Sequence, residues 1–240
     1  MSAEHKYANA AKKVSIIIVT YNAAASLQKC LDSIYALNYP FEIVIMDGAS
    51  TDDTINILEK NSTHIFWKSE PDAGIYDAMN KALQHATGDW LYFLGSDDEL
   101  LPGFTGLVNE LTGDKTIYYA NVIHKNTKRA EKLSPYYMAK VGIYHQSIIY
   151  PKYAFANRKY DARYRVFADY AFNLQCFGDK ELSFVYKDYI IANYAHTGLS
   201  SHATDESFEN DKSSLILKNF GLKIWLRYKF RLLKEQLRKK

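Results

Sequence analysis

The chain has 240 residues, a length at which α/β proteins often form one domain around a single sheet. Hydrophobic residues make up 48% of it and charged residues 24%, a globular composition that excludes wholesale disorder. The longest apolar runs, such as residues 15–19, are too short to cross a bilayer, so we expect no membrane-spanning helix.

The cysteines and the first residues give no sign of secretion. Cys30 and Cys176 lie far apart and lack metal-ligand spacing, which is typical of reduced, buried thiols. Residues 1–13 read as a polar N-terminal extension without the apolar stretch of a secretory signal. We therefore expect a cytoplasmic protein.

The first half of the chain alternates strand-like and helix-like patterns. β-branched apolar runs predict strands at residues 14–20, 41–46, 64–68 and 90–94. Apolar residues at helical spacing predict helices at residues 24–37 and 73–86. Between them, a third helix is predicted to begin after a cap at Thr51 or Asp52. Four such repeats predict an α/β fold with a mostly parallel sheet flanked by helices.

Polar clusters follow three of the predicted strands. They are Tyr21-Asn22, residues 47–52 and residues 96–99. The carboxyl ends of parallel strands meet at one edge, and ligands bind beyond that edge. The three loops are therefore expected to converge on one site.

The second half is less regular. Residues 116–123 and 144–150 read as strands, residues 167–176 as a helix, and residues 182–194 as strands broken near Asp188. Residues 196–206 form a polar loop. No strong linker or repeat is visible, so a second domain is not required.

Adjacent carboxylates follow the fourth predicted strand at Asp97 and Asp98. Side by side they repel each other unless a cation joins them. Mg²⁺ and Mn²⁺ prefer such oxygen ligands, completed by substrate phosphates. Helix capping by one of the two is an equally open alternative. The sequence contains no P-loop and no G-x-G-x-x-G after the first strand, which disfavours kinases, NTPases and dehydrogenases.

Five segments in this order resemble the successive motifs of the family 2 glycosyltransferases, over roughly residues 14–200. They are 14–22 (VSIIIVTYN), 47–54 (DGASTDDT), 69–81 (SEPDAGIYDAMNK), 86–89 (ATGD) and 96–98 (SDD). That family has the GT-A fold and inverts configuration at the transferred sugar, and its bacterial members mostly build surface polysaccharides. The resemblance implies a nucleotide-sugar half at 14–100 and an irregular acceptor half at 101–204.

The resemblance also implies a role for individual residues of the first half. The nucleotide-sugar donor would contact Thr20, Tyr21, Asn22, Asp47, Asp52, Gly74, Asp77, Lys81 and Asp97. Tyr21 would pack on the base or ribose, and Asp47 and Asp52 would line the base pocket. Asp98, with Asp97, would hold a divalent Mn or Mg ion. Helix capping remains an equal alternative for Asp77.

Residues 166–170 (VFADY) resemble the helix start whose Asp removes the proton from the acceptor hydroxyl. This makes Asp169 the implied catalytic base, with capping of the helix as the alternative. His145-Gln146 and Asp161 resemble acceptor-side residues, and a structural role is the alternative for His145. His196 precedes a loop that resembles a segment closing over the donor.

The sequence departs from the family pattern at three places. Gly48 stands where an Asp usually reads the base, and Ala168 stands where a Glu often precedes the catalytic Asp. The Gln-x-x-Arg-Trp signature of processive synthases is absent. The last departure favours transfer of one sugar. The expected donor is a UDP-sugar or a related donor, and the expected acceptor is a glycan or a lipid-linked molecule.

The C-terminal residues 205–240 predict basic amphipathic helices. Residues 218–240 contain nine basic residues and one acidic residue, Glu235. At 100° per residue, one face carries Leu222, Trp225, Leu226, Phe230, Leu232, Leu233 and Leu237. Another face carries Lys223, Arg227, Arg231, Lys234 and Arg238. Residues 221–240 could lie on the inner face of the cell membrane, or pack on the core or in a homodimer.

Two other functions compete with sugar transfer. A catalytically inactive assembly subunit that binds nucleotide-sugars would not need Asp98 and Asp169, and both are present. A nucleotidyltransferase would need a Gly-rich basic loop after the first strand, where the chain has Tyr21-Asn22-Ala23-Ala24. Nucleic acid is not an expected partner, because the rest of the chain is acidic and carries no binding motif.

Overall fold

The computed structural model describes residues 13–125, 127–129, 133–195 and 204–238. Its first half alternates strands and helices, as the apolar runs predict. In chain order the elements are β1 (Val14–Thr20), α1 (Leu27–Tyr35), β2 (Glu42–Asp47), α2 (Thr54–Lys60), β3 (Phe66–Ser69), α3 (Ile75–Ala82) and β4 (Trp90–Gly95).

The second half mixes short and long elements. They are β5 (Glu99–Leu100), α4 (Gly103–Asn109), β6 (Thr116–His124), β7 (Thr127–Arg129), α5 (Pro135–Lys140), η1 (His145–Ser147), β8 (Ile148–Pro151), η2 (Lys152–Phe155), α6 (Ala168–Gly178), β9 (Ser183–Tyr194) and α7 (Glu206–Arg238).

All the described strands belong to one sheet with the order β3-β2-β1-β4-β8-β6-β9-β5, and β7 pairs with β6. The first four strands along this order are parallel, and β8 runs against both β4 and β6. β6 and β9 are again parallel to each other. The predicted mostly parallel α/β sheet is therefore confirmed.

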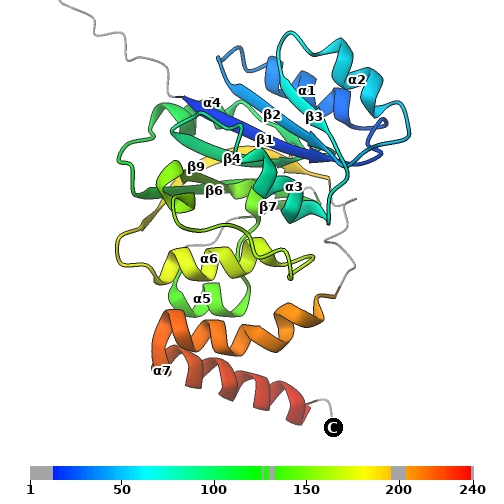
Figure 1. Cartoon of the computed structure of the whole chain (residues 1–240). Coiled ribbons are helices and arrows are strands. Elements are labelled where there is room, and N and C mark those ends of the chain that lie inside the picture. Colours follow the sequence, from blue (N-terminus) through cyan, green and yellow to red (C-terminus); the bar gives the residue numbers. More distant parts are fainter. Residues whose placement is uncertain (1–12, 126, 130–132, 196–203, 239–240) are drawn as a thin grey trace, which may run out of the picture.

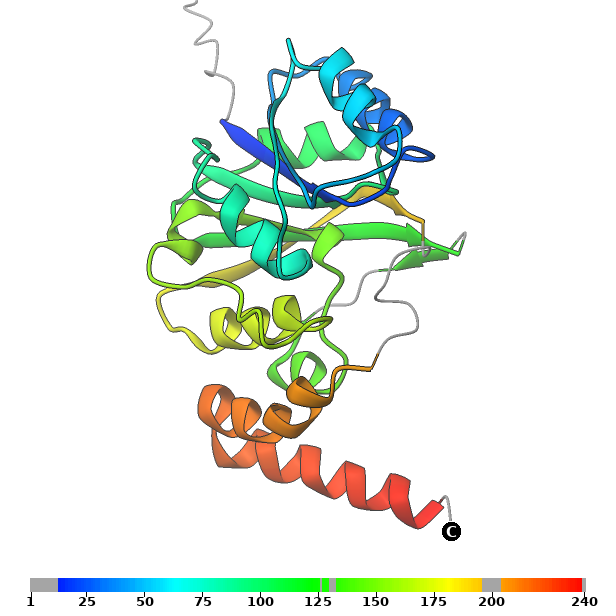
Figure 2. The same cartoon turned by 45° about the vertical axis from the view of Figure 1, so that its right-hand side comes forward.

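Helices cover both faces of this sheet (Figures 1 and 2). Side chains alternate along each buried strand, so Ile16 and Ile18 face the layer of α1, α2 and α4, while Ile17 faces α3 and α6. Burial on both faces explains why these strands are apolar throughout instead of alternating with polar residues.

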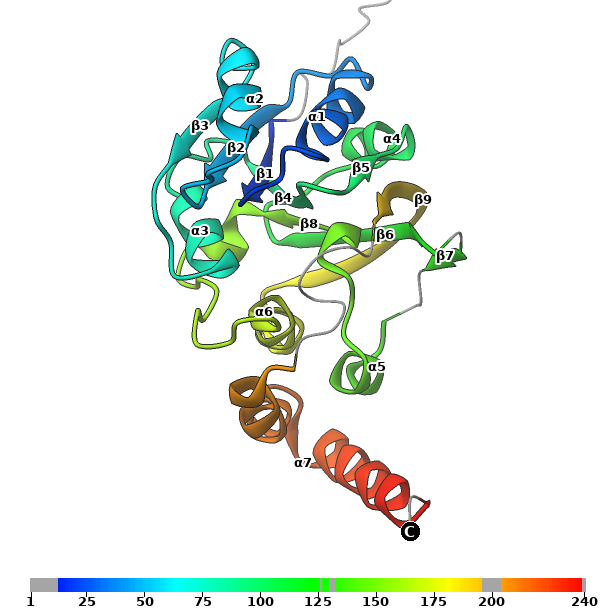
Figure 3. The same cartoon turned by 90° about the vertical axis from the view of Figure 1, so that its right-hand side faces the viewer.

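α7 forms a further layer outside α5 and α6, and it consists of two helices joined at Gly221 (Figure 3). Gly221 has φ 74°, a backbone conformation that glycine adopts without a steric penalty. Asp205 caps the first of the two helices, because its Oδ1 accepts a hydrogen bond from Phe208 N at 3.1 Å. None of the described helices is long and apolar enough for a transmembrane span.

The structure corrects two strand predictions. Residues 145–147 form the 3₁₀ turn η1 and not a strand, so β8 begins at Ile148. β9 is continuous through Asp188, and the expected break is instead an irregular register against β6, where Tyr119 pairs with Tyr186 but Asn121 pairs with Ile190. The helices α4 and α5 had no clear signal in the sequence.

Glu42 joins the amino-terminal ends of three strands. Its carboxylate accepts hydrogen bonds from the hydroxyls of Ser15 and Thr87 and from the backbone N–H groups of Thr87 (2.7 Å) and Gly88 (3.2 Å). Partial burial raises the pKa of Glu42, but these hydrogen bonds outweigh it and leave the pKa below its ordinary value.

We expect Glu42→Gln to lower the free energy of unfolding by about 1 kcal/mol at neutral pH, because Glu42 is partly exposed and water screens its contacts. The folded-state pKa is depressed, so the carboxylate's contribution is present above the unfolded-state value of about 4.3 and is lost as pH falls through the folded-state pKa. Urea denaturation should therefore show a gap between wild type and variant that closes in acid. A gap of constant size would contradict this.

Candidate active site

The loops after β1 and β2 are tied to each other by hydrogen bonds. Asn22, with φ 48°, donates its backbone N–H to Ser50 Oγ at 2.7 Å, and its Oδ1 accepts from Thr51 N at 2.9 Å. The strands themselves are in register at this point, with Thr20 opposite Asp47. The two loops therefore form one continuous rim.

Asp47 and Asp52 hold this rim in shape. Asp47 is buried and accepts hydrogen bonds from the backbone and hydroxyl of Ser50 and from Ser69 Oγ at 2.7 Å. Asp52 accepts from Ala24 N at 3.1 Å and from Thr54. Both carboxylates order the loops after β1 and β2, and their expected place in a base pocket stays a prediction. At the end of β1, Thr20 Oγ1 is buried and has no hydrogen-bond partner among the described residues.

Tyr21, Gly48 and Asp72 bring the loops after β1, β2 and β3 together. Tyr21 is 64% exposed and presents its ring to solvent at the rim. A Cβ on Gly48 would lie 2.7 Å from Asp72 Oδ2 and 3.5 Å from Tyr21 Cδ2. The Asp72 carboxylate thus occupies space that a side chain at position 48 would fill. Asp72 Oδ1 accepts from the backbone N–H of Gly74, which precedes α3.

Asp98 joins three elements around the end of β4. Its side chain is buried, and Oδ2 accepts hydrogen bonds from Gln146 Nε2 at 2.7 Å and from Gly95 N at 3.2 Å. Oδ1 accepts from Ala195 N at 2.9 Å, just beyond β9. Burial raises the pKa of Asp98, and the hydrogen bonds from Ala195 and Gln146 only partly offset this. Protein donors therefore occupy both oxygens of Asp98.

Asp97 is partly exposed. Its carboxylate lies close to Gly95 at the end of β4, because a Cβ placed on Gly95 would be 2.9 Å from Asp97 Oδ1. Among the described residues no three His, Cys, Asp or Glu side chains gather into a closed metal site. Mg²⁺ and Mn²⁺ do not require one, because one or two carboxylates and substrate phosphates often hold them. A partly exposed carboxylate at this rim fits a cation of that kind.

Asp169 lies in the first turn of α6 and contacts two side chains from other elements. Tyr76 of α3 donates its hydroxyl to Asp169 Oδ1 at 2.8 Å, and His145 Nδ1 lies 3.5 Å from Oδ2. Asp205 accepts hydrogen bonds from the backbone N–H groups of Val166 (2.9 Å) and Phe167 (3.2 Å), directly before α6. The position of Asp169 is thus fixed from three sides.

His145 and Gln146 link the two acidic centres, because neighbouring residues of η1 reach Asp169 and Asp98 respectively. Burial lowers the pKa of His145, but the Asp169, Asp98 and Asp97 carboxylates outweigh this effect and raise it above its ordinary value. Nε2 of His145 is buried without a hydrogen-bond partner among the described residues. His145 therefore lies beside the Asp169 carboxylate, in a region made negative by Asp97 and Asp98.

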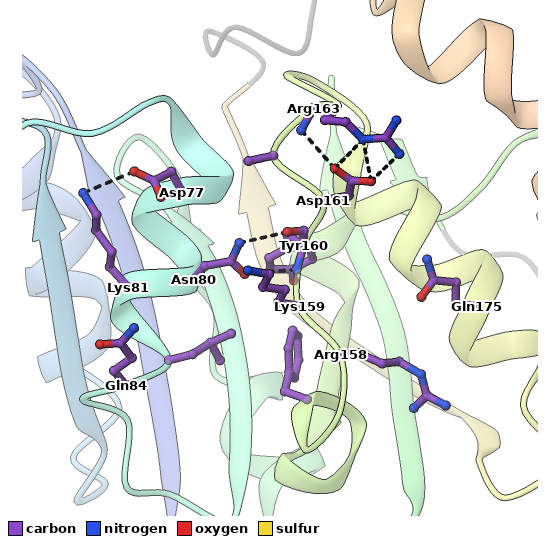
Figure 4. Close-up of a pocket in the computed structure, with 13 residues that line it drawn as sticks. Asp77, Asn80, Lys81, Gln84, Arg158, Lys159, Tyr160, Asp161, Arg163 and Gln175 are labelled. Atoms are coloured by element: carbon purple, nitrogen blue, oxygen red, sulfur yellow. Dashed lines mark hydrogen bonds and ion pairs between the residues drawn. The ribbon is translucent and has the colours of Figure 1, made fainter.

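Three other predicted residues line a pocket of about 850 Å³ between α3 and the segment 158–163 (Figure 4). Asp77 accepts from Ala73 N at 3.0 Å and pairs with Lys81 at 3.2 Å. Lys81 also donates to Pro71 O at 2.9 Å, and Asp161 pairs with Arg163 at 2.7 Å. These contacts hold the local loops, and the expected donor or acceptor roles of Asp77, Lys81 and Asp161 stay predictions.

The structure gathers most of the predicted site at one edge of the sheet. β1 pairs with β2 on one side and β4 on the other, with Val19 opposite Gly95, so the rim residues and Asp97-Asp98 follow neighbouring strand ends. His196 lies outside the described residues. Sequence reasoning missed Asp72, Tyr76 and Asp205, although Asp72 and Tyr76 lie inside the recognised segment 69–81. It placed Gln146 on the acceptor side and missed its hydrogen bond to Asp98.

Comparisons with known proteins show the family and the fold of the chain. The model of the family "Glycosyl transferase family 2" matches residues 15–174. A PGL/p-HBAD biosynthesis glycosyltransferase of Mycobacterium bovis is 38% identical over 217 residues, which cover 83% of each chain.

Two solved structures share the fold. A fragment of S. aureus TarS has a TM-score of 0.65 at 19% identity, covering 86% of this chain and 65% of that chain, so this chain spans slightly less than two thirds of it. The same TarS fragment has been solved with UDP-GlcNAc. The mannosyltransferase PcManGT from Pyrobaculum calidifontis, solved with GDP-Man and Mn²⁺, has a TM-score of 0.64 at 18% identity and covers 88% of this chain and 64% of that chain.

The family model covers well over half of the chain, and the mycobacterial relative matches most of its length. The chain therefore belongs to glycosyl transferase family 2 and is a glycosyltransferase with a GT-A-like fold.

Proposed function

We propose that this enzyme transfers one sugar, with inversion, from a nucleotide-diphosphate-sugar to a glycan or lipid-linked acceptor in polysaccharide biosynthesis. The observation that carries the proposal is the connection through His145 and Gln146 between the carboxylates after β4 and Asp169 on α6. It supports a donor site and a base within one rigid unit. The contacts of Asp169 with Tyr76 and His145 also favour an active enzyme over an inactive assembly subunit.

The donor's nucleoside would lie on the rim formed by the loops after β1, β2 and β3. The exposed ring of Tyr21 can pack against a base or ribose. Beside it, the Asp72 carboxylate can accept an N–H from the base edge, the role that Gly48 cannot fill. Uracil offers one such N–H and guanine offers more, so a UDP-sugar is the first donor to test and a GDP-sugar the second.

A divalent Mn or Mg ion, when bound, would compensate the negative charge that develops on the leaving diphosphate. We assign its protein ligand to Asp97 in preference to Asp98, because both oxygens of Asp98 already accept hydrogen bonds from the protein. Asp98 instead holds the end of β4 against η1 and β9. From the sequence, in contrast, Asp98 is the main expected metal ligand.

Asp169 would act as the base for the acceptor. Its carboxylate takes the proton of the acceptor hydroxyl, whose oxygen attacks the anomeric carbon and forms the new glycosidic bond. The bond from that carbon to the diphosphate breaks at the opposite face, and the electron pair leaves with the diphosphate. Tyr76 and His145 hold the carboxylate in place.

We expect the two adjacent carboxylates to behave differently when each is changed to the amide. Asp97→Asn should stay folded but lose the Mn²⁺-dependent rise in melting temperature that UDP-sugars or GDP-sugars produce in wild type. Asp98→Asn should lose about 2 kcal/mol of unfolding free energy, because an amide NH₂ would face buried donors. The opposite result would assign the metal to Asp98. In that case Asp97→Asn keeps metal-dependent donor binding, while a folded Asp98→Asn loses it.

We expect Asp169→Asn to bind the donor with unchanged affinity but to hydrolyse it at least about 100-fold more slowly, because the base that activates the hydroxyl or water is lost. Release of nucleotide from the preferred donor in the presence of Mn²⁺ measures the rate. Asp32→Asn, on the exposed face of α1, is the matched control and should keep full activity. Wild-type hydrolysis by Asp169→Asn would exclude it as the base.

A further inference from the structure

The second helix of α7, residues 222–238, carries a stripe of exposed apolar side chains. The stripe consists of Leu222, Leu226, Phe230, Leu233 and Leu237, which are between 51% and 65% exposed. At 100° per residue these five positions fall within an arc of about 80°. Such a narrow and continuous stripe on an outer helix is typical of a surface that binds something.

The opposite side of this helix is already occupied. Trp225, Tyr228 and Leu232 pack with Ile216 of the first α7 helix and Ala139 of α5. Trp225 Nε1 donates to Ser213 Oγ at 3.0 Å. The structure therefore divides the apolar face expected from the sequence, because Trp225 and Leu232 turn inward while the five stripe residues stay outside. Packing therefore fixes the rotation of the helix and leaves the stripe exposed to solvent. The helix itself lies at the outer edge of the molecule (Figure 3).

Basic residues flank the stripe. Lys223, Arg227, Arg231, Lys234 and Arg238 share the adjacent arc, and Lys229 lies on the other edge. Glu235 is the single acidic residue of 222–238, and it pairs with Arg231 at 2.7 Å. The segment 222–238 thus carries a net charge of +5, whereas residues 1–221 carry −4.

We propose that residues 222–238 dock this glycosyltransferase on an anionic membrane surface, with the stripe inserted among the acyl chains and the flanking cations against the lipid headgroups. Apolar and basic residues in adjacent arcs are the pattern of helices that lie in the membrane interface. The acidic remainder of the chain is repelled by the same surface, which leaves this helix as the side that faces the membrane. This inference stands apart from the assignment of donor, metal and base.

The charges distinguish a membrane from a second copy of the chain as the occupant. A symmetric dimer through the stripe would bring cations of the two helices together in either orientation, because basic residues border both edges of the stripe, and the one carboxylate of each helix is already paired within its own helix. An anionic bilayer offers both an apolar interior and negative headgroups. Charge complementarity therefore favours the bilayer.

The test is flotation of the full chain with vesicles of phosphatidylcholine, with and without phosphatidylglycerol. We expect binding only to the anionic vesicles, with a decrease at high salt because salt screens the headgroup charge. The double variant Leu226→Gln/Phe230→Gln and, independently, Lys223→Gln/Lys234→Gln/Arg238→Gln should each reduce binding at least tenfold. Leu217→Gln, an exposed leucine of the first α7 helix outside the stripe, is the matched control and should bind as wild type does.

Two results would overturn the proposal. One is vesicle binding that is absent in wild type, or that is equal in wild type, the stripe variant and the variant of the flanking cations. The other is a lipid-free dimer, seen by sedimentation velocity, that Leu226→Gln/Phe230→Gln converts to monomer, which would make the stripe an interface between copies. The substituted side chains are exposed, so the variants should fold, and circular dichroism checks this.

Discussion

The buried carboxylate of Asp98 is the interaction on which the arrangement of the site depends. It takes hydrogen bonds from the end of β4, from Gln146 in η1 and from the backbone beyond β9. A buried carboxylate is costly unless donors satisfy it, so these three elements must meet for the fold to be stable. Their meeting brings Asp97 to the rim and places His145 beside Asp169.

The rest of the site is held by the same means, with polar groups that connect loops instead of pointing at solvent. Asn22 joins the loops after β1 and β2, Asp47 joins the ends of β2 and β3, and Asp205 joins the start of α7 to the start of α6. Such contacts fix reacting groups before substrate arrives, which lowers the cost of reorganisation during the reaction. The outer helix of α7 contributes in a different way, by presenting a surface on the side of the molecule that carries its positive charge.

The repeating half of the fold could be predicted from sequence, because long apolar strands and amphipathic helices have clear periods. The motifs also located Asp97, Asp98 and Asp169. Sequence could not decide which of two adjacent aspartates is buried, because that depends on Gln146, which lies 48 residues from Asp98. It could not assign η1 either, since a short apolar segment reads equally as a strand. In α7 the period showed an apolar face, but only tertiary packing shows that Trp225 turns inward while Leu226 stays exposed.

The most direct test of this account is the position of manganese in the wild-type enzyme. Crystals are soaked with Mn²⁺ and the nucleotide diphosphate that binds best, and the anomalous signal locates the ion. The account predicts that the carboxylate of Asp97 coordinates the ion directly, while Asp98 keeps its hydrogen bonds to Gln146 and Ala195. Manganese ligated by Asp98 with Gln146 displaced, or manganese bound away from the end of β4, would contradict it.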